Sequence, residues 1–112
     1  MCGITGWIDQ RGLPSGAETS LRRMNETLRH RGPDDAGYWA SRIAIFGHTR
    51  LSVIDIEKGS QPMVFPAENP AEPRLILSYN GEIYNHRELR NQLMACGRRF
   101  HTMSDTEVLL NA

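Results

Sequence analysis

The sequence predicts an α+β fold in which helices pack on a largely antiparallel sheet. Two observations support this prediction. Short stretches of alternating apolar residues are separated by turn signals rather than by long helical crossovers, as expected of hairpin connections. Longer stretches carry apolar residues three and four positions apart, which is typical of amphipathic helices. The order along the 112 residues is strand, helix, several strands and two further helices, which favours sheets covered by helices.

The first strand is expected at residues 2–9, CGITGWID, where side chains alternate between two faces. Gly3 and Gly6 both lie within this stretch. A glycine inside a strand often marks the close approach of another backbone or of a ligand. We therefore expect another backbone segment or a ligand to pack closely against the first strand.

A helix should follow from Ala17 to about Arg29. Ser15 and Glu18 have the spacing of a capping box, in which each side chain satisfies a backbone N–H at the start of a helix. The expected buried face is a stripe at intervals of four, three and four residues, formed by Ala17, Leu21, Met24 and Leu28. This helix is interpreted as core packing without a chemical role.

The middle of the chain reads as loops and short strands. Residues 30–37 are polar and rich in turn formers, and are expected to be a loop. Strands are expected at 37–40 and 42–48, followed by an extended segment over 49–55. Residues 66–73, PAENPAEP, predict an exposed loop.

The next strand is expected at residues 75–79, and Asn80-Gly81 predicts a tight hairpin into a second strand at 82–84. A helix should then run from Asn85, paired with Glu88 as a cap, to Cys96, and Gly97 should end it. Its predicted apolar stripe makes Cys96 a core thiol, together with Leu89 and Leu93.

Near the end of the chain, Ser104 and Glu107 have the spacing of another capping box, and an apolar run follows. The sequence stops at Ala112, about two turns into this helix. We therefore expect a truncated piece of a longer domain.

Composition excludes several classes of function. Thirteen Lys and Arg balance thirteen Asp and Glu, so the zero net charge argues against nucleic acid or an anionic membrane as partner. No stretch has the length of a transmembrane helix, and the N-terminus does not resemble a signal peptide. Only two cysteines are present, which favours free thiols in the cytoplasm. No metal site is expected, because the histidines lack Cys-x-x-Cys partners; they are His30, His48, His86 and His101.

Cys2 directly follows the initiator methionine. Removal of Met1 would leave a thiol and a free α-amine on one residue. A thiolate is a strong nucleophile, and an α-amine, with a typical pKa of about 7.7–8.0, is partly unprotonated near neutral pH. Nucleophile and general base would then share one residue. The alternative is that Cys2 is a small apolar residue at the start of a buried strand.

Five motifs in register resemble the glutaminase domain of the class II glutamine amidotransferases, in the branch of the glutamine-hydrolysing asparagine synthetases. They are MCGI (1–4), HRGPDD (30–35), GHTRLSVID (47–55), YNGEIYNHRELR (79–90) and SDTEV (104–108). The resemblance implies the fold of the N-terminal-nucleophile hydrolases, an αββα sandwich of two antiparallel sheets between helical layers. It covers almost the whole chain, which would then be the N-terminal part of such a domain.

The resemblance also implies hydrolysis of the glutamine side-chain amide, with Cys2 as nucleophile and its α-amine as base. Asn80 and the backbone N–H of Gly81 would stabilise the oxyanion. Arg50 would bind the α-carboxylate of glutamine. The implied glutamine-binding set is Arg50, Leu51, Ser52, Val53, Ile54, Asn80, Gly81, Glu82 and Asp105, with the two acidic residues facing the α-ammonium group. Arg31 is expected in the wall of the site, and His48 is interpreted as structural.

In the implied parent enzyme, a synthetase domain outside residues 1–112 would bind ATP and Mg²⁺ and amidate aspartate with the released ammonia. No cofactor is expected in residues 1–112, which contain neither an SGG-type pyrophosphate loop nor a P-loop. A homodimeric parent is compatible with the resemblance. The alternatives are an amidotransferase of an antibiotic or polysaccharide pathway, and a non-catalytic module that keeps Met1.

Overall fold

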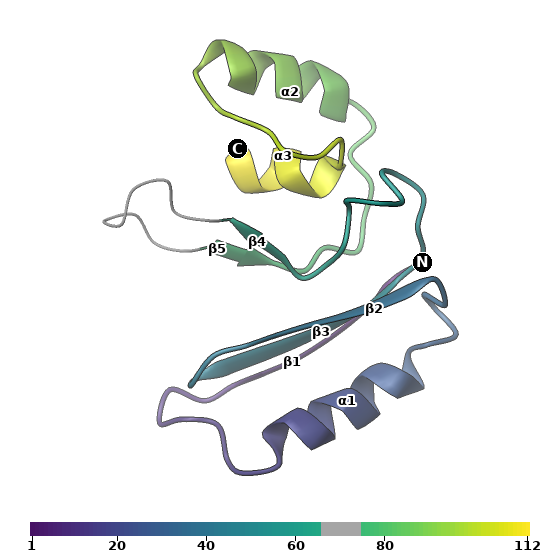
Figure 1. Ribbon diagram of the computed structural model, residues 1–112, viewed down its shortest axis with the longest axis vertical. Helices are drawn as coiled ribbons and strands as arrows, with labels where there is room; N and C mark the ends of the chain where they lie inside the picture. The colour runs from purple at the N-terminus through teal and green to yellow at the C-terminus, as the bar shows by residue number, and fades with distance from the viewer. Residues whose placement is uncertain (66–74) are drawn as a thin grey trace.

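The computed structural model describes residues 1–65 and 75–112. Two antiparallel sheets lie between one helix on one side and two helices on the other (Figure 1). The predicted α+β class and the αββα layering are confirmed. The elements are β1 (Gly3–Ile8), α1 (Ala17–Thr27), β2 (Asp35–Ala40), β3 (Ala44–Arg50), β4 (Met63–Phe65), β5 (Leu75–Leu77), α2 (His86–Ala95) and α3 (Asp105–Asn111).

The larger sheet has the order β1-β3-β2, and both pairings are antiparallel. The register pairs Gly3 with Thr49 in β3, which brings the N-terminus to the end of the central strand. The expected crowding at the two glycines is confirmed. A Cβ at Gly3 would lie 2.6 Å from Thr49 Oγ1, and one at Gly6 would lie 3.0 Å from the Phe46 ring.

Helix α1 covers the outer face of this sheet, with Leu21 fully buried. The predicted stripe is wrong at one position, because Met24 is 42% exposed and Asn25 is only 1% exposed. Asn25 lies one turn after Leu21 and faces polar partners on the sheet. Its carbonyl oxygen accepts from Thr5 Oγ1 at 3.2 Å, and its amide donates to the His48 carbonyl at 3.4 Å.

The start of α1 also differs from the prediction. Gly16 is the N-cap residue, with a left-handed φ of 86°, and no side chain caps the helix. A residue without a Cβ adopts this conformation readily, so the Ser15–Glu18 capping box does not form. Glu18 instead pairs with Arg22 at 2.8 Å on the exposed face. The helix ends at Thr27, two residues before the predicted Arg29.

The boundaries of β2 and β3 differ from the predicted strands at 37–40 and 42–48. β2 begins at Asp35, inside the predicted polar loop, and β3 continues through Arg50. The longer β3 is paired on both sides, with β1 and with β2. The segment predicted to be extended from residue 49 therefore leaves the sheet only after Arg50.

The second sheet consists of β4 and β5, with Met63 paired to Leu77. The hairpin predicted at Asn80-Gly81 is wrong, because residues 82–84 form no strand. The partner of β5 is instead β4, which lies earlier in the chain and was not predicted. Gly81 does not adopt the positive φ that a type I′ turn requires. The predicted exposed loop at 66–73 lies outside the described residues.

Helix α2 begins after Asn85, which makes no side-chain capping bond, and ends before Gly97, whose φ is 88°. The predicted glycine stop is confirmed. The core role predicted for Cys96 is wrong, because this thiol is exposed. No residue of α2 is fully buried, since the helix lies at the outside of the described part of the molecule and packs on α3.

Helix α3 begins as predicted, with the Ser104 hydroxyl accepting the Thr106 N–H at 3.1 Å. Glu107 does not complete the capping box. Its carboxylate accepts the N–H groups of His101 and Thr102, each at 2.7 Å. The acid therefore fixes the chain leading into α3 rather than the N-cap residue.

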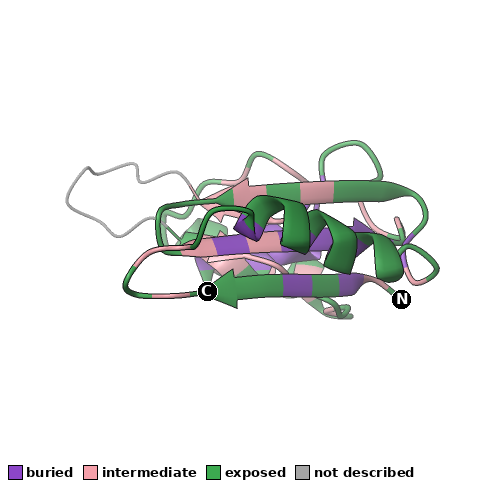
Figure 2. Ribbon diagram, turned by 90° about the horizontal axis from the view of Figure 1, so that it is seen from below, coloured by how far each residue is buried: buried purple, intermediate pink, exposed green. Residues whose placement is uncertain are grey.

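The buried interior is unusually polar. Figure 2 shows buried residues along the central strand and on the side of α1 that faces it. Among the described residues, the buried hydrophobic set is Ala17, Leu21, Ile45 and Val108. The buried polar set is larger: Thr5, Asn25, His48, Thr49, Arg50, Gln61, Ser104, Asp105, Thr106, Glu107 and Asn111. None of the helices in the described ranges has the length and apolar character needed to cross a membrane.

Candidate active site

A pocket of about 350 Å³ opens at the C-terminal end of β3. Four segments form its walls: the N-terminus, the residues after β3, the residues after β5 and the first turn of α3. The lining residues are Met1, Cys2, Arg50, Leu51, Val53, Ile54, Gly59, Gln61, Tyr79, Asn80, Gly81, Glu82, Tyr84, Ser104, Asp105 and Thr106.

The structure brings nearly all of the predicted site residues to this pocket. Within the predicted glutamine-binding set, Ser52 is the exception, because it does not line the pocket and its N–H donates to Asp34 Oδ2 at 2.7 Å. The predicted set omitted several lining residues, among them Gly59, Gln61 and Tyr79. Tyr79 is the first residue of the YNGEIYNHRELR motif, which could have indicated it. Gly59 and Gln61 lie outside the five motifs, where the sequence gives only turn signals.

Cys2 lies beside the start of the segment that follows β3. The antiparallel register of β1 and β3 brings it there, and its Sγ accepts the N–H of Leu51 at 3.3 Å. Met1 precedes Cys2 and also lines the pocket. In this form of the chain the free α-amine belongs to Met1, one residue away from the thiol.

The HRGPDD segment supports the site from behind. Arg31 does not line the pocket, in contrast to the prediction; its Nε donates to the Cys2 carbonyl at 3.0 Å. Gly32 packs so closely on β3 that a Cβ there would lie 2.4 Å from the Thr49 carbonyl. Any side chain at position 32 would push the loop away, and Cys2 would lose its support.

Arg50 ends β3 and is only 5% exposed. Its guanidinium donates to three carbonyls of the following loop: Ile54 at 2.9 Å, Asp55 at 2.7 Å and Ile56 at 3.0 Å. These bonds hold the charged group at the pocket wall in a fixed orientation. Only its remaining N–H groups are left for a ligand, since a guanidinium has five in all.

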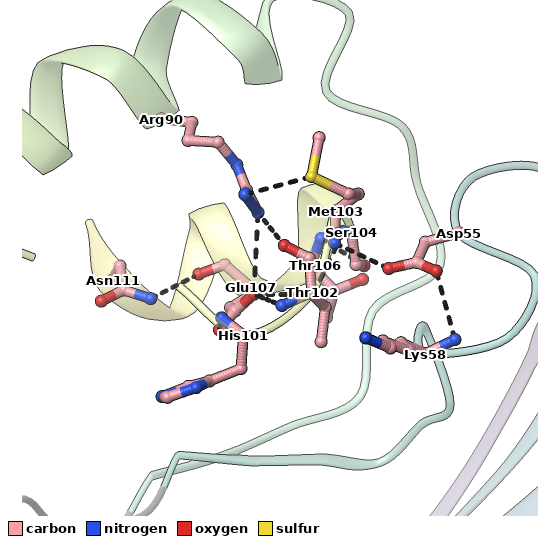
Figure 3. A network of polar contacts seen from close by, with 10 residues as sticks. All are labelled: Asp55, Lys58, Arg90, His101, Thr102, Met103, Ser104, Thr106, Glu107 and Asn111. Carbon is pink, nitrogen blue, oxygen red and sulfur yellow. Dashed lines mark hydrogen bonds and ion pairs between the residues drawn. The ribbon is translucent and has the colours of Figure 1, made fainter. Parts of the chain in front are cut away.

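Asp55 connects this loop to α3. It adopts a left-handed φ of 49°, and its carboxylate accepts the N–H of Met103 at 2.7 Å and that of Lys58 at 3.2 Å (Figure 3). Its carbonyl is one of the three that bind Arg50. Asp55 therefore connects the Arg50 side chain to the segment just before Asp105.

His48 joins the two sheets. It is fully buried in β3, and its Nδ1 lies 2.9 Å from Ser78 Oγ, just after β5. Its Nε2 is buried and has no hydrogen-bond partner within residues 1–65 and 75–112. Burial and the nearby positive charge of Arg50 lower the pKa of His48 from 6.5 to about 4, with Asp35 opposing the shift. The imidazole is therefore neutral at pH 7, as its structural interpretation requires.

Two neighbouring segments of the pocket carry acidic side chains, Glu82 after β5 and Asp105 in the first turn of α3. Burial, followed by the charges of Asp105 and Glu82, raises the pKa of the Tyr79 phenol. Asp105 Oδ2 accepts the N–H of Ile83 at 3.0 Å, which ties α3 to this loop. Gly81 contacts Tyr79 so closely that a Cβ at position 81 would lie 2.4 Å from the phenol oxygen. Cationic Arg50 and anionic Glu82 and Asp105 thus meet in one pocket.

A second polar network lies behind α3 and was not predicted (Figure 3). Arg90 of α2 lies 3.7 Å from Glu107 Oε2, and the two side chains are 11% and 8% exposed. Arg90 also bonds the Thr102 carbonyl and stacks over the Phe100 ring at 4.4 Å. This network fixes the helix that presents Asp105. Sequence spacing gave no sign of it, because Glu107 fits a capping box equally well.

No group of three or more His, Cys, Asp or Glu side chains in the described part of the chain could hold a metal ion. The site instead offers a thiol, a guanidinium, two carboxylates and an Asn-Gly turn. These groups can bind a zwitterionic amino acid and attack an amide.

Two antiparallel sheets between helical layers, with a cysteine at the pocket just before the first strand, match the fold class of the N-terminal-nucleophile hydrolases. Within this class, the chain belongs to the glutamine amidotransferase domain family, whose model matches residues 1–112.

Curated relatives agree with this assignment. The chain is 45% identical over 112 residues to glutamine-hydrolyzing asparagine synthetase 3 of Bacillus subtilis, covering 100% of this chain and 18% of that protein. It is 44% identical to asparagine synthetase 1 of the same organism, over 98% of this chain and 17% of that protein. It is 38% identical to asparagine synthetase B of Escherichia coli, over 98% of this chain and 19% of that protein. The chain thus spans less than a fifth of the length of these relatives.

Proposed function

We propose that residues 1–112 are the N-terminal part of a glutaminase domain, and that the longer enzyme uses the released ammonia to convert aspartate to asparagine. One observation carries this proposal. Four separate segments bring Cys2, Arg50, Asn80-Gly81 and Asp105 into a single pocket. These groups suit the two ends of glutamine, an amide to be attacked and an α-amino acid head group to be held.

The proposed reaction begins with the loss of Met1, which leaves the α-amine on Cys2. The amine takes the thiol proton through a water molecule, and the thiolate attacks the carbon of the side-chain amide. The amine then gives the proton to the leaving nitrogen, so that ammonia departs and a thioester joins Cys2 to the glutamyl group. Water hydrolyses the thioester, releases glutamate and restores the thiol.

Each tetrahedral intermediate carries a negative oxygen that needs fixed donors. We assign this role to the Asn80 side-chain amide and the Gly81 N–H. The α-carboxylate of glutamine would meet the remaining N–H groups of Arg50. Its α-ammonium would meet Glu82 and Asp105, together with backbone carbonyls between Leu51 and Ile54. Burial of Arg50 and Asp105 strengthens such charge recognition, because little water screens it.

The synthetase part of the proposed parent enzyme lies outside residues 1–112. It would bind ATP and Mg²⁺, activate aspartate and receive ammonia from the glutaminase part. The identities of 38–45% to asparagine synthetases support this acceptor over those of antibiotic or polysaccharide pathways. A cytoplasmic location and a homodimeric parent belong to the same proposal.

The test is glutamate release by the full-length protein, after mass analysis has shown that Met1 is absent. Cys2→Ala should abolish glutamate release and leave ammonia-dependent synthesis intact. A glutamine-analogue electrophile, diazo-oxo-norleucine, should label Cys2 alone. Cys96 is the internal control, because it is exposed but lies outside the pocket. Absence of glutamate release from protein that lacks Met1 would contradict the proposal.

A second candidate is a non-catalytic amidotransferase-like module. Retention of Met1 would favour it, because Met1 lines the pocket and keeps the α-amine one residue away from the thiol. If Met1 is retained in the mature protein, no base is available on Cys2. Mass analysis of the N-terminus separates the two candidates.

A further inference from the structure

Gln61 is a buried polar side chain that the proposed reaction does not use. It is 8% exposed, lies between Arg50 and β4, and lines the pocket. Its backbone is fixed against the larger sheet, because a Cβ on Gly37 of β2 would lie only 1.8 Å from the Gln61 carbonyl oxygen. The Gln61 side chain therefore extends from a backbone position that is held against β2.

Both ends of the Gln61 amide are engaged, each with a different segment that lines the pocket. Its carbonyl oxygen accepts the N–H of Tyr79 at 2.6 Å, and its NH₂ group donates to Thr106 Oγ1 at 3.1 Å. The orientation of the amide follows from chemistry, since the Tyr79 N–H can only donate and must meet the oxygen. Thr106 Oγ1 must then be the acceptor. Thr106 itself is 2% exposed, so this bridge is shielded from water.

The two partners of Gln61 are direct neighbours of proposed site residues. Tyr79 precedes Asn80, and Thr106 follows Asp105. We propose that Gln61 is a positioning residue that sets the separation between the Asn80-Gly81 turn and Asp105, and so matches the pocket to the length of glutamine. This inference rests on the proposed function, because it assigns Gln61 a task within the same site.

The two ends of the bridge should affect different kinetic constants. The Asn80-Gly81 turn would act on the oxyanion, which exists only along the reaction, so loosening it lowers kcat. Asp105 would bind the α-ammonium group in the ground state and the transition state alike, so loosening it raises KM. Gln61 is bonded both to Tyr79, next to Asn80, and to Thr106, next to Asp105. Thr106 contributes only to the position of Asp105.

The experiment is glutaminase kinetics on the full-length enzyme with four variants. Gln61→Met keeps the length of the side chain and removes both hydrogen bonds. Thr106→Val removes only the acceptor, and Thr106→Ser keeps it. Gln92→Met, on the exposed surface of α2, controls for the loss of a glutamine. Ammonia-dependent synthesis is measured for each variant, because it bypasses the glutaminase site.

We expect Gln61→Met to lower kcat by about tenfold to a hundredfold, as misplacement of a reacting group by about 1 Å does, and to raise KM. Thr106→Val should raise KM with kcat nearly unchanged, and Thr106→Ser and Gln92→Met should behave as the unsubstituted enzyme. Hydrogen exchange at the Tyr79 amide should accelerate in Gln61→Met alone. Ammonia-dependent synthesis should be the same in all variants.

Two results would overturn the inference. One is a Gln61→Met enzyme that matches Gln92→Met in glutaminase kinetics and in exchange at Tyr79. The other is an equal loss of glutamine-dependent and ammonia-dependent synthesis, which would mean that Gln61 only supports folding. Failure of the proposed function is distinct from both, because the unsubstituted enzyme would then release no glutamate while exchange at Tyr79 still reports on the bridge.

Discussion

Acidification should destabilise this protein through His48. The imidazole is buried between the two sheets, and burial together with Arg50 lowers its pKa from 6.5 to about 4. The folded protein therefore holds His48 neutral, whereas the unfolded chain binds a proton once the pH falls below about 6.5. Stability that is fully present above the unfolded pKa is lost as the pH falls through this window towards 4.

The size of this effect follows from the shift. One pKa unit corresponds to about 1.4 kcal/mol, so a shift from 6.5 to about 4 amounts to roughly 3 kcal/mol at pH values below the folded pKa. This is a substantial part of the stability of a typical domain, which is about 5–15 kcal/mol. The Nδ1 contact to Ser78 does not offset it, because a hydroxyl can pair with either form of the ring.

The assay is equilibrium urea unfolding at pH 7.5, 5.5 and 4, with His48→Gln as the test variant. Glutamine removes the titrating group and keeps a polar partner for Ser78. The free energy of unfolding of the unsubstituted protein should fall by roughly 3 kcal/mol more than that of His48→Gln over this range. His30→Gln, on the exposed loop after α1, should follow the unsubstituted protein. An identical decline in His48→Gln would refute the reasoning.

Three further substitutions test the packing around the site. Glu107→Gln should accelerate hydrogen exchange at the Thr102 amide by about tenfold to a hundredfold, because a charge-assisted hydrogen bond stabilises by about 1.5–3 kcal/mol; unchanged exchange would contradict this. Gly37→Ala should lower the urea midpoint far more than Gly6→Ala, since its Cβ would lie 1.8 Å from a backbone oxygen rather than 3.0 Å from a ring. Asp55→Ala should melt below Asp55→Gly, because φ at this position is 49° and a left-handed conformation costs about 1–2 kcal/mol for a residue with a Cβ; equal melting temperatures would argue against strain there.

The parts of the fold that depend on local pattern could be predicted from the sequence. Alternation placed β1, and a stripe at helical spacing placed α1 with an error at one position. The cap at Ser104 is also local and was correct. The hairpin at Asn80-Gly81 was wrong because strand pairing is not local. β5 pairs with β4, whose three residues carry too little pattern to be recognised alone.

The site, too, contains residues that local sequence motifs predict and residues that they do not. The family motifs contain most of the residues that line the pocket, because those residues lie in short recognisable segments. Gln61 and Asp55 could not be predicted as connectors, since their partners are distant in sequence. Gln61 bonds residues 18 and 45 positions away, and Asp55 bonds one 48 positions away. Periodicity and spacing contain no information about such contacts.

The polar interior is a consequence of building a pocket from loops. Backbone groups in a sheet satisfy one another, but those of a buried loop need side-chain partners. In this protein those partners are pocket side chains. Arg50 donates to three carbonyls of the loop after β3, Asp105 accepts the N–H of Ile83, and Gln61 accepts the N–H of Tyr79. Removing one of them leaves a buried donor or acceptor unpaired, at a cost of about 1–3 kcal/mol. The residues that shape the pocket are therefore also residues that stabilise the fold.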